Sequence, residues 1–464
     1  FFFPFCVIIG QTLDTELLEL QFSNDGYPER FTRAENGFFF TSDDSELWFS
    51  DGTVQGTQFF SKSPNSGDIS LILPQGNSIF FVAEKDHRTD ELWVSDGTEE
   101  GTIQLTDRNL SLGQDGSISN AIVLGNKVLF SLFDVTYGTE LWISDGTVEG
   151  TFMLKDINEG ENNSSPSDFF LFNERIFFKA STEETGVELW VSDGTTDGTI
   201  MLKDINEGDQ SSMASSSGYK IYNDNFYFFA NNGVVGNELW KSDGTSDGTI
   251  LVKDIYEGSS YDSGGNFMQG GVLNGKLLFL ANDGLHGTEL WQTDGTAQGT
   301  TIFYEIVEGQ NSSFGYYSQL IFSNSKAFFY VTDTSQNRGL WASDGTISGT
   351  KFLKDTSVGN LTFDQLGESI YFFGDSDSGY EKILWKSDGT VQGTQVVSQK
   401  ATGTNISSHE NDIIILDNSV FFAAETERNG IELWVSDGSN EGTSLFYDLN
   451  SSYGVGPSLF TAVG

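Results

Sequence analysis

The stretch that decides the fold is PSDFFLFNERIFFKASTEETGVELWVSDGTTDGTIMLKDINEG, residues 166–208. It divides into four apolar segments, 168–172, 175–180, 188–192 and 199–205, which are separated by short polar loops. Short apolar runs that are rich in aromatic and β-branched residues and bounded by Gly, Asn, Asp and Ser are typical of strands. Because the connections are short, we expect the four strands to form an antiparallel meander.

The same unit recurs along the chain, and a tryptophan marks each copy. The tryptophans follow one another at intervals of about 48 residues, which is the period of four-stranded propeller blades. Each is preceded by Leu, so the two-residue period of a strand puts Leu and Trp on opposite faces of the sheet. Stacking the units around an axis buries both faces. The tryptophans are Trp48, Trp93, Trp142, Trp190, Trp240, Trp291, Trp341, Trp385 and Trp434.

These patterns predict an all-β fold, a β-propeller of four-stranded antiparallel blades built from nine tandem repeats and closed as one large ring. Two smaller rings or an open arc are the alternatives, because a repeat period does not fix the closure angle. We expect each indole to lie in the core between neighbouring blades rather than to form a surface platform for a sugar. A ligand platform is not needed at the same place in every repeat.

An aspartate stands three residues after every tryptophan and opens the loop between the third and fourth strands. It is followed by Gly and then by Thr, with Ser439 in place of Thr in the ninth repeat. An aspartate in this position accepts backbone N–H groups, and the glycine adopts positive φ without steric cost. We therefore interpret these residues as turn chemistry. They are Asp51, Asp96, Asp145, Asp193, Asp243, Asp294, Asp344, Asp388 and Asp437.

The amino-acid composition limits the classes of function that we expect for this protein. With 67 acidic and 23 basic residues the formal charge is -44, so the field of the protein repels nucleic acids and anionic lipid surfaces. The single cysteine, Cys6, precedes the repeats, and His87, His286 and His409 have no recurring Ser or Cys partner. We therefore expect no nucleic-acid partner, no Ser-His-Asp triad and no zinc or haem site.

The two ends of the chain differ from the repeats. Residues 1–10, FFFPFCVIIG, are uncharged and too short to span a bilayer, and we interpret them as the remnant of a signal peptide. Residues 11–464 form the expected repeat domain. The segment near residue 17 aligns with a fourth strand, and residues 457–464 align with a first strand that stops at its turn. We expect these fragments to share a closing blade and the repeat domain to be truncated at its C-terminal end.

Calcium is an alternative role for the acidic loops. The loop NDGLHGTE, from Asn282 to Glu289, gathers Asp283, Glu289 and backbone carbonyls before a tryptophan, and these are ligands that suit a hard cation. The corresponding loops keep the glutamate but vary the rest, and Gly339 and Ile383 replace the glutamate in two repeats. We therefore expect solvated loops and no cofactor, with calcium at Asp283 and Glu289 as the alternative.

The variable loops are the expected sites of recognition. The segments between fourth and first strands, such as 158–167, 206–218 and 256–270, are rich in Ser, Asn, Gly and Tyr. This composition suits adaptable polar contact with glycans or proteins. The ligand-loop candidates are Tyr256, Tyr261, Tyr316 and Tyr317, and the alternative for each is an ordinary surface position.

The repeat resembles the ELWxxDGT repeat family, which is found in secreted proteins of Bacteroidetes and other bacteria. The resemblance covers residues 20–450 and recurs nine times. It implies residence outside the cell or on its surface, often with a separate C-terminal sorting domain read by the type IX secretion system. We expect a monomeric, non-catalytic adhesion scaffold, not inserted in a membrane, that recognises glycans or proteins. The alternatives are a polysaccharide-active hydrolase or lyase with a site in the central channel, and a calcium-stabilised structural spacer.

Overall fold

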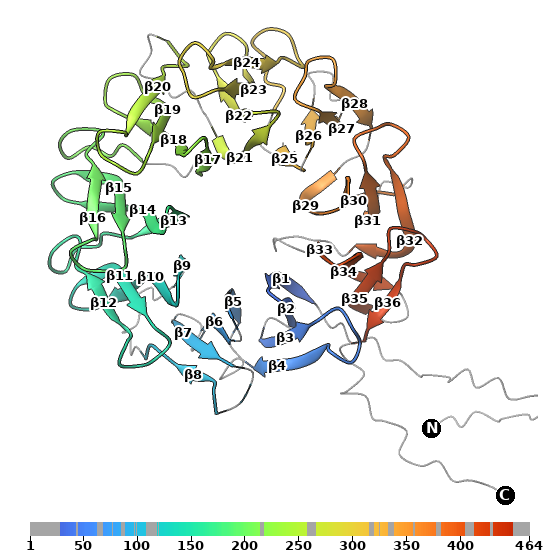
Figure 1. The fold of residues 1–464 in the computed structure, drawn as a ribbon, viewed down its shortest axis with the longest axis horizontal. Coiled ribbons are helices and arrows are strands. Elements are labelled where there is room, and N and C mark those ends of the chain that lie inside the picture. The colour runs from blue at the N-terminus through green and yellow to red at the C-terminus, as the bar shows by residue number, and fades with distance from the viewer. Residues whose placement is uncertain are drawn as a thin grey trace, which may run out of the picture.

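Nine four-stranded sheets, the blades, are arranged around an axis and form one closed ring in the computed structural model (Figure 1). Among the described residues the secondary structure consists of strands, without a helix. The prediction of a nine-bladed, all-β propeller in a single ring is therefore confirmed. The structure describes residues 28–448, with gaps at 43–44, 63–67, 77, 85–88, 97, 99, 108–117, 119, 214–217, 258–265, 315–319, 324, 333–337, 356–357, 377–381, 404–412 and 427–429.

Each blade is an antiparallel meander of four strands that are consecutive in sequence, with the first strand nearest the centre of the ring (Figure 1). Blade 1 contains β1 (Glu29–Ala34), β2 (Gly37–Ser42), β3 (Glu46–Ser50) and β4 (Gln58–Lys62). Blade 2 contains β5 (Ile69–Gln75), β6 (Ser78–Glu84), β7 (Asp90–Ser95) and β8 (Ile103–Gln104). Blade 3 contains β9 (Ala121–Leu124), β10 (Lys127–Asp134), β11 (Gly138–Ser144) and β12 (Phe152–Lys155).

The middle blades follow the same plan. Blade 4 contains β13 (Ser167–Phe172), β14 (Arg175–Thr182), β15 (Gly186–Ser192) and β16 (Ile200–Lys203). Blade 5 contains β17 (Lys220–Tyr222), β18 (Asn225–Asn231), β19 (Asn237–Ser242) and β20 (Ile250–Lys253). Blade 6 contains β21 (Asn266–Leu273), β22 (Lys276–Asn282), β23 (Thr288–Thr293) and β24 (Thr301–Tyr304).

The last three blades complete the ring, and β32 also pairs with β34 of the next blade through Thr402 and Glu425. Blade 7 contains β25 (Leu320–Phe322), β26 (Ala327–Thr332), β27 (Arg338–Ser343) and β28 (Lys351–Lys354). Blade 8 contains β29 (Val358–Leu366), β30 (Ser369–Asp375), β31 (Lys382–Ser387) and β32 (Gln395–Gly403). Blade 9 contains β33 (Ile413–Leu416), β34 (Ser419–Thr426), β35 (Gly430–Ser436) and β36 (Ser444–Tyr447).

The third strand of each blade contributes to the core on both of its faces. In blade 5, Trp240 packs against blade 4, whereas Leu239 packs against blade 6. Every pair of neighbouring blades is joined in this way, by a leucine from one blade and a tryptophan from the next. The indoles of blades 1, 4, 5, 6, 8 and 9 are at most 8% exposed, and those of Trp93, Trp142 and Trp341 are partly buried.

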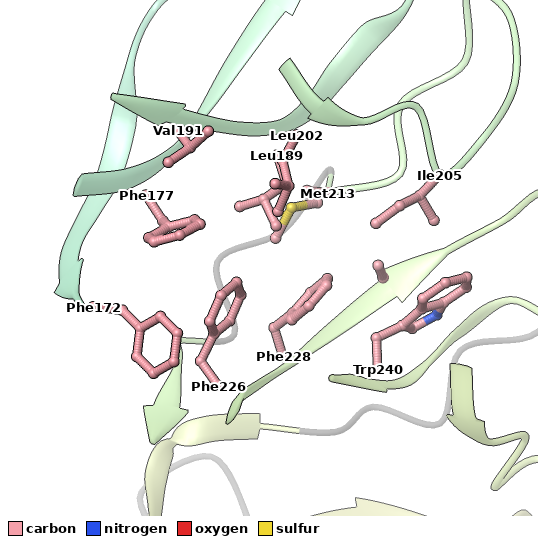
Figure 2. Packing of buried hydrophobic residues seen from close by; sticks show 11 residues of the cluster. Phe172, Phe177, Leu189, Val191, Leu202, Ile205, Met213, Phe226, Phe228 and Trp240 are labelled. Atoms are coloured by element: carbon pink, nitrogen blue, oxygen red, sulfur yellow. The ribbon is translucent and has the colours of Figure 1, made fainter. Parts of the chain in front are cut away.

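The boundary between blades 4 and 5 shows how the sheets interlock. Figure 2 shows Phe226, Phe228 and Trp240 of blade 5 facing Phe177 and other apolar side chains of blade 4. The rings of Phe177 and Phe226 lie 4.9 Å apart between centroids. A buried aromatic side chain removes about 150–250 Å² from water, so each such boundary supplies a large share of the folding free energy.

The ring closes where blade 9 packs against blade 1. The rings of Phe38 and Phe421 lie 5.1 Å apart between centroids, and Trp48 belongs to the same cluster. The guanidinium of Arg33 donates to the carbonyl of Ile415. Each of these two blades has four strands of its own. The terminal segments near residue 17 and at 457–464, which we expected to share a closing blade, lie outside the described residues.

Lysines on the outermost strands tie neighbouring blades together at the circumference. Lys203 of blade 4 donates to the carbonyl oxygen of Thr249 in blade 5 at 2.7 Å. Lys155 reaches Thr199 in the next blade in the same way, also at 2.7 Å. Each lysine satisfies a carbonyl that precedes the outer strand of its neighbour, so the contact supplements the apolar boundary with a polar one.

Replacing Trp240 by Ala should lower the free energy of unfolding by about 3–5 kcal/mol, because a large side chain is removed from the boundary between two blades. Thermal or chemical denaturation measures the loss. Ile200→Ala is the control, because Ile200 is 51% exposed on the outermost strand. A melting temperature that does not change in Trp240→Ala would refute the core assignment.

Candidate functional site

The antiparallel meander divides the loops between two faces of the ring. Successive strands run in opposite directions, so the turns between first and second strands and the loops between third and fourth strands share one face, here called the turn face. The loops between second and third strands and the connections from blade to blade share the other, here called the connection face. Because the Asp-Gly-Thr loops of the turn face repeat and the blade connections vary, the connection face is the candidate for specific recognition.

Each loop between third and fourth strands is closed by its own aspartate. In blade 4, the Asp193 carboxylate accepts the N–H of Thr195 at 2.9 Å and the hydroxyl of Thr195 at 2.6 Å. The hydroxyl oxygen of Thr195 in turn accepts the N–H of Gly198 at 3.0 Å. The carboxylate-to-hydroxyl bond recurs in all nine blades, with Ser439 as the donor in blade 9. These aspartates therefore hold the loop itself.

The two glycines of this loop are required for different reasons. Gly194 has a φ of 83°, in the left-handed region that disfavours other side chains. Gly198 lies beside the carboxylate, and a Cβ at this position would be 2.0 Å from Oδ1 of Asp193. The spacing of Asp and Gly in the repeat thus follows from the space that the carboxylate occupies.

Hydrogen bonding also fixes the charge of the turn face. The hydroxyl of Thr195 holds the pKa of Asp193 below its usual value, because the ionised carboxylate is the better acceptor. The pKa values of Asp145 and Asp243 are lowered by their threonines in the same way. These carboxylates are therefore ionised at neutral pH.

A buried glutamate ties the connection face to the sheet. Glu188, two residues before Trp190, has 0% of its surface exposed. It accepts the N–H of Ile205 at 3.0 Å and the N–H and hydroxyl of Ser212 at 3.0 and 2.6 Å. Ile205 and Ser212 both belong to the connection from blade 4 to blade 5, so one side chain fixes this loop at two points.

Burial governs the ionisation of this glutamate. Desolvation raises the pKa of Glu188 to about 7, although the hydrogen bonds from Ser212 and Ile205 favour the ionised form. Glu140 and Glu289 make the corresponding bonds in blades 3 and 6, and burial raises the pKa of each to about 7. The connections that leave blades 3, 4 and 6 are therefore held by carboxyl groups whose pKa values burial raises to about 7.

Two blades replace the glutamate with an apolar contact. In blade 7 the ring of Phe352 lies against Gly339, and a Cβ on Gly339 would be 2.3 Å from that ring. In blade 8, Ile383 is 1% exposed and joins the cluster of Trp385. The departures from the repeat at these positions thus have a packing reason.

The two carboxylates considered for calcium have protein partners. Asp283 forms an ion pair of 2.8 Å with His286 and accepts the N–H of Leu285 at 2.9 Å. Glu289 is fully buried and accepts the hydroxyl of Ser313 at 2.6 Å. Within the part of the chain that the structure describes, no three His, Cys, Asp or Glu side chains gather as a metal site. Calcium binding at Asp283 and Glu289 stays a prediction.

Of the four tyrosines proposed for ligand binding, the structure describes one. Tyr256 is partly exposed, and its ring lies against Gly284, where a Cβ would be 2.4 Å from the ring. Tyr256 therefore supports the loop between β22 and β23. Tyr261, Tyr316 and Tyr317 lie outside the described residues.

Hydrogen bonds hold the loops of the connection face against one another. The N–H of Val187 donates to the hydroxyl of Ser211 at 2.9 Å, and the N–H of Thr288 donates to the hydroxyl of Ser312 at 2.9 Å. Each bond joins the beginning of a third strand to the connection that leaves the same blade. A surface whose loops are fixed in advance loses less conformational entropy when a ligand binds.

A partly buried ion pair on the two inner strands of blade 4 departs from the repeat. Nζ of Lys179 lies 2.6 Å from Oδ2 of Asp168, and their side chains are 8% and 24% exposed. Asp168 has a φ of 53° within a bulge of β13, a feature that redirects side chains. Lys179 pairs with the leucine that precedes the tryptophan of its blade. At the same position the other blades carry Thr41, Val82, Ser131, Phe229, Leu280, Tyr330, Phe373 and Ala423.

Blade 5 contributes an aromatic side chain to this cluster. The ring of Tyr219 stacks on Phe170, with centroids 4.2 Å apart and planes inclined by 18°. Burial, and then the charge of Asp168, raises the pKa of the Tyr219 phenol, so the hydroxyl stays protonated. The sequence patterns did not predict this cluster. The available signal was the single lysine in the apolar run 175–180.

The comparisons with known proteins add little to this geometry. No protein-family model and no curated protein matches the chain. BamB from Moraxella catarrhalis is 11% identical with a TM-score of 0.41, and the match covers 75% of this chain and 94% of that one. Puromycin hydrolase is 13% identical with a TM-score of 0.39, and the match covers 83% of this chain but 55% of the hydrolase.

A third solved structure, the β-propeller domain of the Trilobed protease from Pyrococcus furiosus, is 11% identical with a TM-score of 0.35, and the match covers 82% of this chain and 96% of that domain. At these TM-scores the similarities carry no functional argument, and the fold is established by the nine blades themselves. None of the described residues forms a helix that is long and apolar enough to cross a membrane.

Replacing Gly248 by Ala should lower the free energy of unfolding by about 1–3 kcal/mol, because the new methyl group overlaps the Asp243 carboxylate. In the Asp243→Ala background the same substitution should cost much less, because the overlapping group is gone. Chemical denaturation of the four proteins in this cycle gives the coupling energy. Equal costs in both backgrounds would contradict the steric explanation.

The buried glutamates predict that stability falls as the pH rises. Between the usual pKa of 4.5 and the folded value of about 7, Glu188 holds more protons in the folded protein than in the unfolded chain. Its contribution is therefore complete below 4.5 and is lost as the pH rises through about 7, by up to about 3 kcal/mol. Glu188→Gln should flatten the dependence of the melting temperature on pH between 4.5 and 8.

The matched control is Glu207→Gln, an exposed carboxyl in the connection from blade 4 to blade 5. This variant should show the same dependence of the melting temperature on pH as the parent protein. In both proteins that dependence also includes the repulsion among acidic residues, which grows as the pH rises. If Glu188→Gln and Glu207→Gln change the slope equally, the buried carboxyl is not its source.

Proposed function

We propose that this protein is an extracellular or cell-surface scaffold that recognises a glycan through the connection face of its propeller, without catalysing a reaction. The observation that carries the proposal is the ion pair of Asp168 and Lys179. It is a charged exception to the repeat, and it joins β14 to the start of β13, which follows a blade connection and lies near Tyr219 of blade 5.

The geometry of this pair suits the binding of hydroxyl groups. Lys179 is buried and neutralises Asp168, so it holds the carboxylate in one orientation. The Asp168 side chain is still 24% exposed, which leaves part of it accessible to a ligand. Carboxylates accept hydrogen bonds from hydroxyl donors, which every sugar offers. The adjacent stack of Phe170 and Tyr219 fixes the surroundings of the carboxylate.

Three features of the sequence support the location outside the cell. Residues 1–10 are apolar and uncharged, as expected of the core of a signal peptide. The formal charge of -44 favours a soluble protein in a salty environment. The resemblance to the ELWxxDGT repeat family adds residence outside the cell or at its surface.

A glycan array tests the proposal, followed by calorimetric titration of the best ligand. Asp168→Asn keeps the shape of the side chain but removes its charge, and it should weaken binding at least about tenfold. Asp209→Asn is the matched control, because Asp209 is an exposed aspartate of the same face, in the connection from blade 4 to blade 5. Melting temperatures of both variants show whether the fold is retained.

Other outcomes would assign a different role. The absence of glycan binding, or equal affinity in the parent and Asp168→Asn, would reject Asp168 as a contact. Release of oligosaccharide products from a polysaccharide would show a hydrolase or lyase instead. Retention of a protein ligand without any glycan would place recognition in the protein class.

A further inference from the structure

Three large apolar side chains are exposed on the innermost strands of adjacent blades. Leu171, Ile221 and Val272 are 47%, 51% and 44% exposed. They lie on β13, β17 and β21, which face the centre of the ring (Figure 1). All three occupy the same register. Each pairs with a residue of the second strand, and that residue in turn pairs with the Ser or Thr that precedes the loop aspartate. The three side chains therefore lie at one level around the axis, close to the turn face.

The same register is apolar in most of the other blades. We call the nine residues at this position the inner belt; besides the three exposed members it contains Pro74, Val123, Phe322, Ile415, Arg33 and Gln365. A contact joins the first strands of blades 6 and 7 beside the belt. The ring of Phe322 covers Gly271, next to Val272, where a Cβ would be 2.3 Å away. The belt is thus mainly apolar, although Ile415 is buried between blades 8 and 9 and Arg33 is an exposed cation.

Carboxylates surround the inner belt on the turn face. The turns between first and second strands carry exposed acidic residues in five blades, namely Glu35, Glu174, Asp224, Glu368 and Asp417. A basic residue follows the turn in blades 3, 4, 6 and 7, namely Lys127, Arg175, Lys276 and Lys326, and the charges of Lys127 and Lys326 act on the loop aspartates Asp145 and Asp388. Arg175 donates to the carbonyl of Gly244 at 3.0 Å, and Lys276 donates to the side-chain oxygen of Gln292 at 2.9 Å. The field at the centre of the turn face is therefore negative.

The exposed apolar side chains of the inner belt and the carboxylates of the turns together indicate the chemistry of a partner. Single exposed apolar residues are common, but three at one register on the first strands of adjacent blades form a surface of the kind that partners cover. We propose that the centre of the turn face binds a basic segment of another protein in which lysine or arginine alternates with apolar side chains. The apolar side chains pack on Leu171, Ile221 and Val272, and the cations meet the carboxylates of the turns.

The other possible occupants fit this surface less well. A neutral glycan offers neither cations for the carboxylates nor large apolar side chains for the inner belt. A second copy of the chain brings its own charge of -44, so the two turn faces repel each other. A basic, partly apolar peptide satisfies both features of the surface.

The test uses a short fluorescein-labelled peptide of alternating leucine and lysine, with fluorescence anisotropy at physiological ionic strength. Replacing Leu171, Ile221 and Val272 together by Ser should weaken binding at least about tenfold. The matched control replaces Phe152, Ile200 and Ile250 by Ser. These residues are 49%, 51% and 44% exposed, but they lie on the outermost strands of blades 3, 4 and 5. The control should bind as tightly as the parent protein.

A second set of substitutions tests the contribution of the carboxylates to peptide binding. The double variant Glu174→Gln and Asp224→Asn should weaken binding and reduce its dependence on salt. A peptide with serine in place of leucine should bind at least about tenfold more weakly, because the apolar contact is lost. Ile221→Ser alone gives the same direction of change if the triple variant does not fold.

Several results would overturn the proposal. One is equal weakening by the inner and outer triple variants, which would indicate unspecific attraction. Another is equal affinity for the leucine and serine peptides. A third is a dimer in sedimentation that disappears in the inner variant, which would show a second copy as the occupant. The glycan site is tested separately, because Asp168→Asn should leave peptide binding unchanged.

Discussion

The alternation of Leu and Trp on the third strand is the constraint on which the rest of the structure depends. The two side chains point to opposite faces, and both are needed to fill the boundaries with the two neighbouring blades, as Leu239 and Trp240 do in blade 5. A blade alone would expose one apolar face on each side, so the sheet is stable only within the ring. The broad surfaces of the sheets are thus used for stability, and recognition is left to the loops and the innermost strands.

The two faces use acidic residues in opposite ways. On the turn face, Asp145, Asp193 and Asp243 are exposed, have lowered pKa values and are bonded to the hydroxyl within their own loops. On the connection face, Glu188 is buried and has a raised pKa, and it is bonded to the connection leading to the next blade. The first arrangement stabilises a local turn, whereas the second couples a variable loop to the core. A blade connection can therefore change its sequence while its attachment to the sheet is kept.

Much of the fold was predictable because its signals are local. The strand boundaries in 166–208, the burial of tryptophans such as Trp240 and the turn at Asp193 follow from residue spacing and the properties of single side chains. The cluster of Asp168, Lys179 and Tyr219 was not predictable in the same way. It requires a bulge with positive φ at Asp168 and a ring from the next blade, and neither leaves a local pattern. The calcium hypothesis had the same weakness, since the partner of Glu289 is Ser313, on a distant segment.

The closure of the ring bears on how such a protein can evolve. Blade 9 meets blade 1 through side chains such as Phe38 and Phe421, and each of the nine blades is built from its own consecutive strands. Gain or loss of one whole repeat by recombination would therefore leave the four-stranded meander of every remaining blade intact and alter the angle between neighbours. The diameter of the ring, and with it the size of partner that fits at the centre, is then a property that evolution can adjust in steps of one repeat.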